Sequence, residues 1–218
     1  MAKMKVAVLV SGRGSNLQAL LDACAGADFP AEIVAVISNK AGAQGLERAR
    51  KAGVAASFID HTLFDEREAF EKELDAKLKE TGAQLVALAG FMRILTAWFV
   101  ERWKDRLINI HPSLLPAFRG VHTHERALEQ GVRLHGATVH YVRPDMDDGP
   151  IIGQAAVPVL PGDDADALAA RVLEAEHALY PACLKLIAEG KARVTAERVK
   201  IDKTAAADGA ALLINPHR

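Results

Sequence analysis

Asn109 and His111 are the residues of this 218-residue chain whose types and spacing most directly suggest chemistry. They belong to the apolar run 107–111, in which side chains two residues apart share one face of an extended strand. Pro112 and Pro116 follow, and proline cannot donate to a sheet ladder, so the strand should end there. The amide and the imidazole should therefore lie at a strand's C-terminal end, where ligands bind in open α/β sheets. An edge strand with a polar face fits the local pattern equally well.

Asp147 supplies a carboxylate in the turn 147–150, whose Asp-Asp-Gly-Pro sequence is typical of tight turns. A carboxylate near an imidazole fixes its tautomer and favours its protonated form, and an imidazolium beside an amide N–H group stabilises a developing oxyanion. If Asp147 meets Asn109 and His111, the three groups suit acyl-type transfer. No serine or cysteine stands in a nucleophile-elbow context, so direct attack by a substrate nucleophile is indicated. Taken alone, Asp147 is better explained as a turn residue.

A glycine-rich turn, residues 11–16, separates an apolar run from a segment with helical periodicity. Successive backbone N–H groups in such a turn, at the start of a helix, form a cavity for an anion. A dinucleotide fingerprint would need a third glycine where Leu17 stands, and the P-loop pattern is absent. Gly14, Ser15 and Asn16 are therefore candidates for binding a single phosphate monoester, in preference to a purely structural turn.

The remaining histidines suggest less. His122 and His124 resemble a metal-binding pair, but no carboxylate or cysteine completes a ligand set with recognisable spacing, so we expect no metal. His140 alternates on a predicted strand and should face either the site or solvent. Three more histidines are expected at the surface, namely His61, His135 and His217.

Alternating strand and helix patterns position these candidates. Together they predict a doubly wound, mostly parallel α/β sheet with helices on both faces. The expected strands are 5–10, 33–38, 56–59, 85–89, 107–111, 137–142, 151–159 and 198–201. One helix should follow the glycine turn, with Ser15 or Asn16 as its N-cap. The other expected helices cover 45–52, about 65–81, the region of Trp98 to Trp103, and about 163 or 164 to 189. Asp65 should cap the helix that runs to about residue 81. No linker is long enough to separate independent domains, so residues 1–218 should form one domain.

Composition narrows the class of protein. The chain is 50% hydrophobic and 25% charged, with a formal net charge of -1 and no dense basic run, which argues against a nucleic-acid partner. Its two cysteines, Cys24 and Cys183, show no metal-ligand spacing and should be buried free thiols. No apolar stretch is long enough to span a bilayer, so we expect no membrane association and a cytoplasmic protein.

Four segments together resemble the phosphoribosylglycinamide formyltransferase family: 11–17, 89–95, 109–116 and 147–150. The resemblance covers about residue 4 to about residue 190. It implies a formyltransferase-like fold and transfer of the formyl group of 10-formyltetrahydrofolate, a co-substrate, to the primary amine of glycinamide ribonucleotide in de novo purine synthesis, without a metal. The family's catalytic triad falls on Asn109, His111 and Asp147.

The same resemblance implies the binding residues. Gly14, Ser15 and Asn16 would hold the nucleotide phosphate, and Glu176 would face the ribose. The folate site would comprise Arg67, Met92, Arg93, Ile94, Leu95, Arg143, Pro144, Asp145 and Met146. A nucleotide-binding half (about 1–105) would then precede a catalytic and folate-binding half (about 106–195), small molecules would be the partners, and a homodimer is compatible with this interpretation.

Sister families leave an alternative. Residues 116–120 partly resemble formyltetrahydrofolate deformylase and methionyl-tRNA formyltransferase, which also use an Asn, His and Asp set. Those proteins usually carry an extra N-terminal or C-terminal domain for which this chain leaves no room. A non-catalytic nucleotide- or folate-binding protein is a further alternative, but it would not need the three polar groups together. The segment after Val194 has no assigned role.

Overall fold

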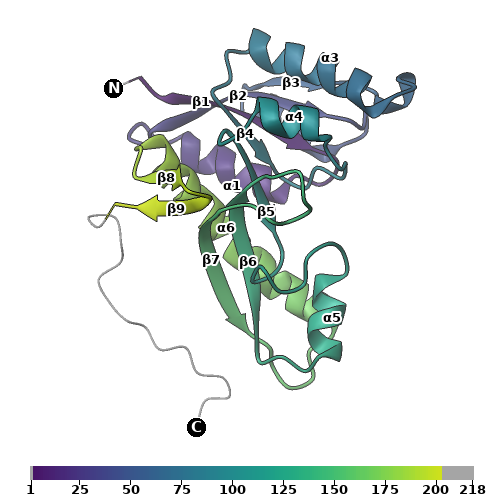
Figure 1. Cartoon of the computed structure of the whole chain (residues 1–218), viewed down its shortest axis with the longest axis vertical. Helices are drawn as coiled ribbons and strands as arrows, with labels where there is room; N and C mark the ends of the chain where they lie inside the picture. The colour runs from purple at the N-terminus through teal and green to yellow at the C-terminus, as the bar shows by residue number, and fades with distance from the viewer. Residues whose placement is uncertain (1, 203–218) are drawn as a thin grey trace.

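A computed structural model of the chain describes residues 2–202 and contains a seven-stranded sheet with the strand order β3-β2-β1-β4-β5-β6-β7 (Figure 1). The strands are β1 (Met4–Val10), β2 (Ala31–Ser38), β3 (Ala55–Phe58), β4 (Leu85–Leu88), β5 (Leu107–His111), β6 (Leu134–Tyr141) and β7 (Ile151–Pro158). Neighbouring strands run parallel from β3 through β5, whereas β6 and β7 are antiparallel to their neighbours. The predicted doubly wound, mostly parallel α/β fold is confirmed.

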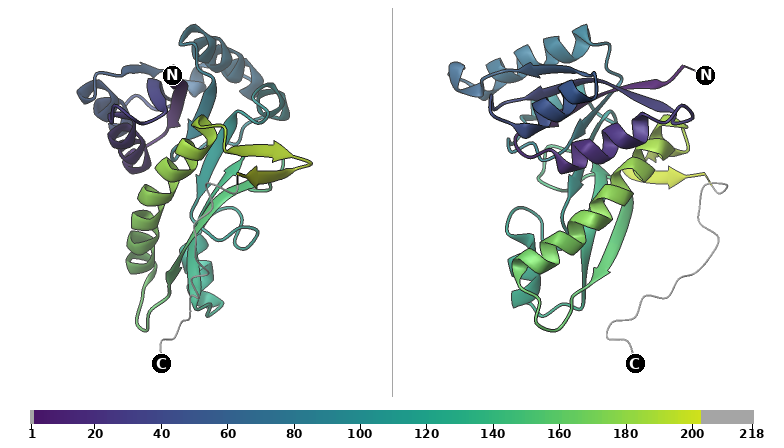
Figure 2. Two further views of the ribbon diagram at one scale, coloured as in Figure 1. Left: turned by 90° about the vertical axis from the view of Figure 1, so that its left-hand side faces the viewer. Right: turned by 180° about the vertical axis from the view of Figure 1, so that it is seen from behind.

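Helices cover both faces of the sheet, as the views in Figure 2 show. They are α1 (Ser15–Cys24), α2 (Gln44–Lys51), α3 (Arg67–Glu80), α4 (Ala97–Arg102), α5 (Thr123–Glu129) and α6 (Ala165–Ala188), with a 3₁₀ turn η1 at His61–Leu63. A separate hairpin, β8 (Ala192–Thr195) and β9 (Arg198–Ile201), follows α6. Among residues 2–202, no helix is long and apolar enough to cross a membrane.

Strand β1 explains why both faces need covering. Its residues alternate between two hydrophobic clusters, with Val6 and Val8 in one and Ala7 and Leu9 in the other. The first cluster is completed by α1, α2 and α6, and the second by α3 and α4. Side chains of successive strand residues point to opposite faces, so a continuous apolar run must be buried on both sides.

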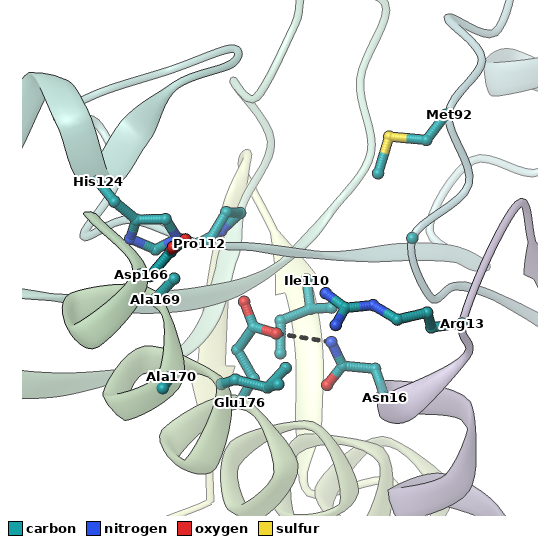
Figure 3. A pocket seen from close by; sticks show the side chains of 12 residues that line it. Arg13, Asn16, Met92, Ile110, Pro112, His124, Asp166, Ala169, Ala170 and Glu176 are labelled. Atoms are coloured by element: carbon teal, nitrogen blue, oxygen red, sulfur yellow. Dashed lines mark hydrogen bonds between the residues drawn. The ribbon is translucent and has the colours of Figure 1, made fainter. Parts of the chain in front are cut away.

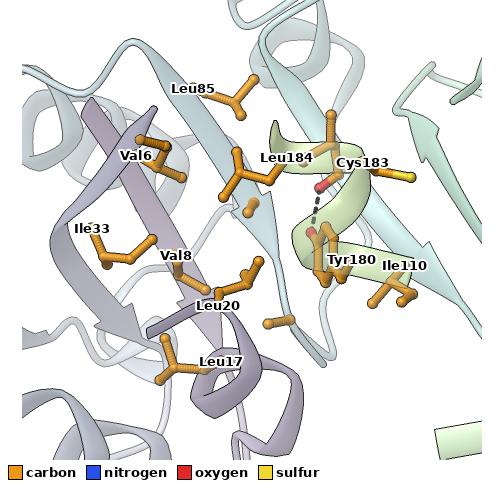
Figure 4. Packing of buried hydrophobic residues seen from close by; sticks show 14 of the residues in the cluster. Val6, Val8, Leu17, Leu20, Ile33, Leu85, Ile110, Tyr180, Cys183 and Leu184 are labelled. Carbon is orange, nitrogen blue, oxygen red and sulfur yellow. Dashed lines mark hydrogen bonds between the residues drawn. The ribbon is translucent and has the colours of Figure 1, made fainter. Parts of the chain in front are cut away.

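Helix α6 is fixed to the centre of the sheet by Tyr180, which is fully buried beside Ile110 and Leu184 (Figure 4). Its hydroxyl group donates hydrogen bonds to the carbonyl oxygens of Leu88, at 3.0 Å, and Ile108, at 3.4 Å. Those carbonyls belong to β4 and β5, so α6 keeps a set position relative to the strand that carries Asn109 and His111.

The structure corrects two predicted helix caps. Gly14, not Ser15 or Asn16, is the N-cap of α1, with a left-handed φ of 69°. A side chain at this position would place its Cβ 2.8 Å from the Cα of Gly45, so the close approach of α2 also requires glycine. Helix α3 begins two residues later than predicted, at Arg67, and Glu66 rather than Asp65 is its N-cap.

The end of the chain was only partly anticipated. The predicted strand 198–201 is confirmed as β9, and its partner β8 was not predicted. The prediction for His217, and the segment from residue 203 onward, lie outside the described residues.

Candidate active site

Asn109 and His111 lie at the C-terminal end of β5, where the sheet changes from parallel to antiparallel. Their register partners on β6 are His140 and Thr138, respectively. The antiparallel pairing sets these polar residues of β5 opposite polar residues of β6, and the turn after β6 begins beside Leu107, the first residue of β5.

His111 is 5% exposed and has an oxygen atom close to each ring nitrogen. Its Nε2 lies 3.0 Å from the carbonyl oxygen of Phe118, and its Nδ1 lies 3.4 Å from Oδ2 of Asp147. A carbonyl oxygen can only accept, so Nε2 carries a proton and donates to Phe118. The Nδ1 edge of the ring is then the one that faces Asp147 and remains for a ligand. The ring can donate from both nitrogens only when both carry a proton.

Asp147 reaches His111 from the turn between β6 and β7. It has a left-handed φ of 53°, a conformation that aspartate tolerates better than most residues. The backbone N–H of Gly120 donates to Oδ2 of Asp147 at 2.9 Å, which holds the carboxylate on the His111 side. The structure thus brings Asp147 to the two side chains, Asn109 and His111, that sequence reasoning had placed together at one strand end.

His140 orients Asn109. Nδ1 of His140 lies 3.0 Å from the carbonyl oxygen of Tyr141, and Nε2 lies 3.3 Å from Nδ2 of Asn109. Burial lowers the pKa of His140 below its usual range. The neutral ring therefore donates from Nδ1 to Tyr141 and accepts from the Asn109 amide at Nε2. The second amide hydrogen of Asn109 stays free for a ligand, so His140 faces the site, one of the two orientations that its strand pattern allowed.

His135 was predicted at the surface, and the structure shows it buried. Its ring packs edge-on against the rings of Phe118 and His124. Strand β6 is buried along almost its whole length, because β5, β7, α6 and the segment 113–118 surround it and His124 of α5 packs on it. His135 precedes the predicted strand 137–142, so sequence reasoning did not place it in the sheet. Burial lowers the pKa of His135 to about 4 and also lowers that of His124.

Acid should destabilise the fold through His135. The pKa of His135 in the folded state, about 4, lies below the 6.5 that is usual for an unperturbed histidine, so the unfolded chain binds more protons between these values. The contribution of His135 to stability is complete above pH 6.5 and is lost as the pH falls toward 4. From pH 6.5 to 5 the loss should be about 2 kcal/mol. Urea unfolding of the wild type and His135→Gln at both values measures it: the wild type should lose more stability than the variant, and equal losses would contradict the assignment.

The glycine turn and α6 meet through Asn16 and Glu176, which are 160 residues apart in the chain. Nδ2 of Asn16 donates to Oε2 of Glu176 at 2.6 Å (Figure 3). Glu176 is buried, and burial raises the pKa of its carboxyl group, while the bond from Asn16 lowers it. Since the Asn16 side chain is engaged, its backbone N–H and those of its neighbours are the groups the turn can offer to an anion.

A cavity of about 510 Å³ opens above this pair. Arg13 reaches into it (Figure 3), from the glycine turn itself. Sequence reasoning did not select Arg13. The available signal was its place between Gly12 and Gly14, which sets a cation inside a predicted anion-binding turn. The cavity is lined by residues from both halves of the chain: Arg13, Asn16, Gly90, Met92, Ile110, Pro112, His124, Asp166, Ala169, Ala170, Leu173 and Glu176.

A second cavity, of about 220 Å³, lies on the other side of Asn109. Eight of the expected folate-site residues divide between the two: Arg93, Ile94, Leu95, Arg143, Pro144, Asp145 and Met146 line the second, and Met92 lines the first. Arg67, the first residue of α3, is not among the lining residues of either. Ile94, Val121 and Met146 expose large apolar side chains here, and an exposed apolar patch marks a surface for binding an apolar group.

A third cavity, of about 400 Å³, joins the first two at the catalytic candidates. It contains Asn109 and His111, shares Met92 and His124 with the first cavity, and shares Val121 with the second. Two ligands that fill the outer cavities would therefore meet beside Asn109, His111 and Asp147.

The segment 90–96 between these cavities is held at both ends. The hydroxyl of Ser11 donates to Asn39 at 2.6 Å and accepts from the backbone N–H of Met92 at 2.8 Å. At the other end, the backbone N–H and hydroxyl of Thr96 both donate to Glu71, which is buried on α3. The segment is therefore positioned before any ligand binds. Within residues 2–202, no group of three or more histidine, cysteine or acidic side chains is arranged to hold a metal ion.

Comparison with known proteins shows the family of this chain. The family described as Formyl transferase matches residues 4–184. The chain is 49% identical over 191 residues to phosphoribosylglycinamide formyltransferase of Escherichia coli (strain K12), covering 88% of this chain and 90% of that protein. It is also 53% identical over 197 residues to a trifunctional purine biosynthetic protein of Drosophila pseudoobscura pseudoobscura, covering 89% of this chain, although the chain spans only 14% of that much longer relative.

Solved structures give the same result. The structure of glycinamide ribonucleotide transformylase 1 from Symbiobacterium toebii superposes with a TM-score of 0.90 at 46% identity, covering 92% of this chain and 95% of that one. A phosphoribosylglycinamide formyltransferase from Coxiella burnetii gives a TM-score of 0.88 at 43% identity, covering 92% of this chain and 94% of that one. This chain therefore belongs to the formyl transferase family, among the phosphoribosylglycinamide formyltransferases.

Proposed function

We propose that this enzyme transfers the formyl group of 10-formyltetrahydrofolate to the primary amine of glycinamide ribonucleotide in de novo purine synthesis. The observation that carries the proposal is the meeting of Asn109, His111 and Asp147 between two separate cavities. Both substrates are small molecules, and we place the reaction in the cytoplasm. A hydrolase acting on formylfolate alone would need only one of the two cavities.

The first cavity suits the nucleotide. Arg13 and Asn16 of the glycine turn line it, and the backbone N–H groups of Gly14, Ser15 and Asn16 at the start of α1 would bind the phosphate, where the helix dipole also favours negative charge. Arg13 adds a full positive charge beside a phosphate monoester. The Glu176 carboxylate, held by Asn16, can accept hydrogen bonds from the ribose hydroxyls. The amine at the far end of the nucleotide would then extend toward His111.

The second cavity suits the folate. Its apolar lining, with Ile94 and Met146, can pack against an aromatic ring system, and its backbone polar groups can bond the ring nitrogens. Residues 143–147 form one wall, so the folate and Asp147 are positioned by the same loop. In this arrangement both halves of the chain contribute residues to each substrate site.

The chemical step uses the Nδ1 edge of His111. The neutral amine attacks the formyl carbon, a carbon–nitrogen bond forms, and the carbonyl electron pair moves to oxygen. The Nδ1–H of protonated His111 and the free Nδ2–H of Asn109 stabilise this oxyanion. Asp147 orients His111 and helps move the surplus amine proton to the folate nitrogen, directly or through a water molecule. The carbonyl then re-forms as the bond to that nitrogen breaks, giving tetrahydrofolate and the formylated nucleotide.

One assay tests the proposal directly. Loss of 10-formyltetrahydrofolate is followed with and without glycinamide ribonucleotide. The proposal predicts turnover that depends on the amine and yields one formylated nucleotide for each folate consumed. Equal loss without the amine would indicate a hydrolase, and no loss in either case would indicate a binding protein.

Replacing Asn16 by aspartate should weaken nucleotide binding selectively. The new carboxylate would stand 2.6 Å from Glu176 in place of the amide nitrogen, which sets two like charges together and adds negative charge beside the phosphate. The KM for the nucleotide should rise by roughly tenfold or more, while that for the folate changes by less than about twofold.

Gln18→Glu is the matched control for this prediction. It makes the same amide-to-acid exchange on α1, but Gln18 contacts Asp22 and Arg48 and does not line the cavity. Its nucleotide KM should stay near the wild-type value. If Asn16→Asp raised both KM values equally, the nucleotide would have to bind elsewhere.

A further inference from the structure

The guanidinium group of Arg143 forms hydrogen bonds within the protein from each of its three nitrogen atoms. Its Nε donates to Oε2 of Glu197 at 2.7 Å, its Nη2 donates to Oδ1 of Asp105 at 2.6 Å, and its Nη1 donates to the carbonyl oxygen of Val142 at 3.1 Å. The side chain is 10% exposed. Arg143 lines the proposed folate cavity, but its charge is already paired with two carboxylates.

Both carboxylates come from residues with left-handed backbone. Asp105 has a φ of 57° and Glu197 a φ of 56°. Glu197 and Ala196, whose φ is 50°, form the two-residue connection between β8 and β9, since Thr195 pairs with Arg198. Hairpins with two left-handed residues strongly favour Asn-Gly, and neither residue here is of that kind. Such strain persists at positions where the surroundings require it.

Glu197 lies next to the segment 143–147, which lines the proposed folate cavity. Strand β9 packs beside β7, which brings the hairpin turn next to the start of the segment 143–147 (Figure 1). The other end of this segment is also held, because Asp148 pairs with Arg119 and Asp147 accepts from Gly120. Arg143 is thus the attachment at one end of a loop whose other end carries a catalytic candidate.

We propose that Glu197 and Asp105 are positioning residues that hold the folate loop, residues 143–147, in its binding conformation through Arg143. This proposal assigns a function to the β8–β9 hairpin, which includes part of the segment after Val194 for which the sequence indicated no role. The part of the inference that concerns folate rests on the proposed function. The part that concerns the loop's attachment does not, so the two are tested separately.

The attachment is tested by hydrogen exchange. Glu197→Gln keeps the size of the side chain and removes its charge, so backbone amides of residues 143–149 should exchange faster, by roughly threefold to tenfold, as expected for loss of an ion pair. Glu80→Gln is the control: Glu80 is 66% exposed in its side chain, against 61% for Glu197, and pairs with Lys77 on α3. Unchanged exchange in the loop of Glu197→Gln, or equal acceleration in Glu80→Gln, would overturn the inference whatever the enzyme's activity.

The consequence for folate is tested by kinetics. Glu197→Gln should raise the KM for 10-formyltetrahydrofolate by roughly threefold to tenfold and leave that for the nucleotide within about twofold. Arg143→Lys, which keeps the charge but loses the fork that binds two carboxylates, should show the same split. If the wild type turns over and the two KM values of Glu197→Gln stay at the wild-type level or rise together, the attachment of the loop does not affect folate binding. A wild type without turnover would instead contradict the proposed function, and hydrogen exchange would still decide the attachment.

Glu197→Gly separates positioning from stability. Glycine adopts the left-handed conformation without strain, so this variant should raise Tm relative to Glu197→Gln. It removes the carboxylate all the same, so loop exchange and the folate KM should rise as in Glu197→Gln. A variant with a higher Tm than Glu197→Gln but wild-type loop exchange would show that Glu197 does not hold the loop.

Discussion

Replacing His111 by alanine should lower kcat for formyl transfer by roughly 10²- to 10⁴-fold, because it removes the main group that stabilises the oxyanion. The Nδ1 edge of His111 faces Asp147 at 3.4 Å, and His111 lines the cavity between the other two. His122 and His124 line the same cavity, but the second imidazole near Asp147 is that of His140, at 3.9 Å. His140 cannot replace it, since its Nδ1 is bound to the Tyr141 carbonyl and burial keeps its ring neutral. The KM for each substrate should change little.

Two further variants are controls for loss of activity through misfolding. His111→Gln retains a donor for the Phe118 carbonyl, so the segment 112–118 should stay in place while kcat falls by a similar factor. His61→Ala removes a half-buried histidine that bonds Asn39 and lies outside the three cavities, and its kcat should stay near that of the wild type. Turnover of His111→Ala within tenfold of the wild type would rule out the mechanism.

Much of this architecture is encoded in local patterns. A β-branched run such as Val6–Val10 must be buried on both faces, and runs of this kind alternating with helical periods fix the doubly wound sheet. Period-two geometry also places Asn109 and His111 on one face of β5, because that depends only on neighbouring residues. Local sequence patterns are therefore sufficient to predict the strand end and its two polar side chains.

Contacts between segments that are distant in the sequence are not predicted by such local patterns. No local signal shows that β6 runs antiparallel to β5, yet this reversal places His140 beside Asn109 and delivers Asp147 to His111. The same applies to Asn16 and Glu176, which meet only because α6 packs along α1. Sequence analysis proposed that Asp147 meets Asn109 and His111, and the family resemblance named Glu176, but the bonds from Gly120 to Asp147 and from Asn16 to Glu176 are seen only in the fold.

Burial is the other property that local patterns predicted poorly. The strand was predicted over 137–142, and His135, which precedes that range, was predicted at the surface, whereas it belongs to β6 and is buried. The strand is covered on both faces by segments that only the tertiary fold brings there, so its local sequence does not indicate which of its residues are exposed. Similarly, Gly14 became the N-cap of α1 because α2 approaches it closely, not because of its capping strength.

Replacing Asp147 by asparagine should lower kcat/KM by roughly 10²- to 10³-fold with little change in structure. Asparagine has the same shape, tolerates the φ of 53°, and keeps an acceptor oxygen for the Gly120 N–H. Only the negative charge that faces Nδ1 of His111 is lost. The ring then lacks the carboxylate that orients it and the acceptor that helps move the amine proton.

The neighbouring residue provides the control for this prediction. Asp148→Asn makes the same charge change in the same turn, but Asp148 is paired with Arg119 at the surface, so its kcat/KM should fall by less than about threefold. Asp147 is proposed both to orient His111 and to help move the amine proton, so the variant carrying both Asp147→Asn and His111→Ala should be slower than His111→Ala alone, but by less than the product of the two single losses. Losses that multiply fully in the double variant would mean that Asp147 does not act through His111.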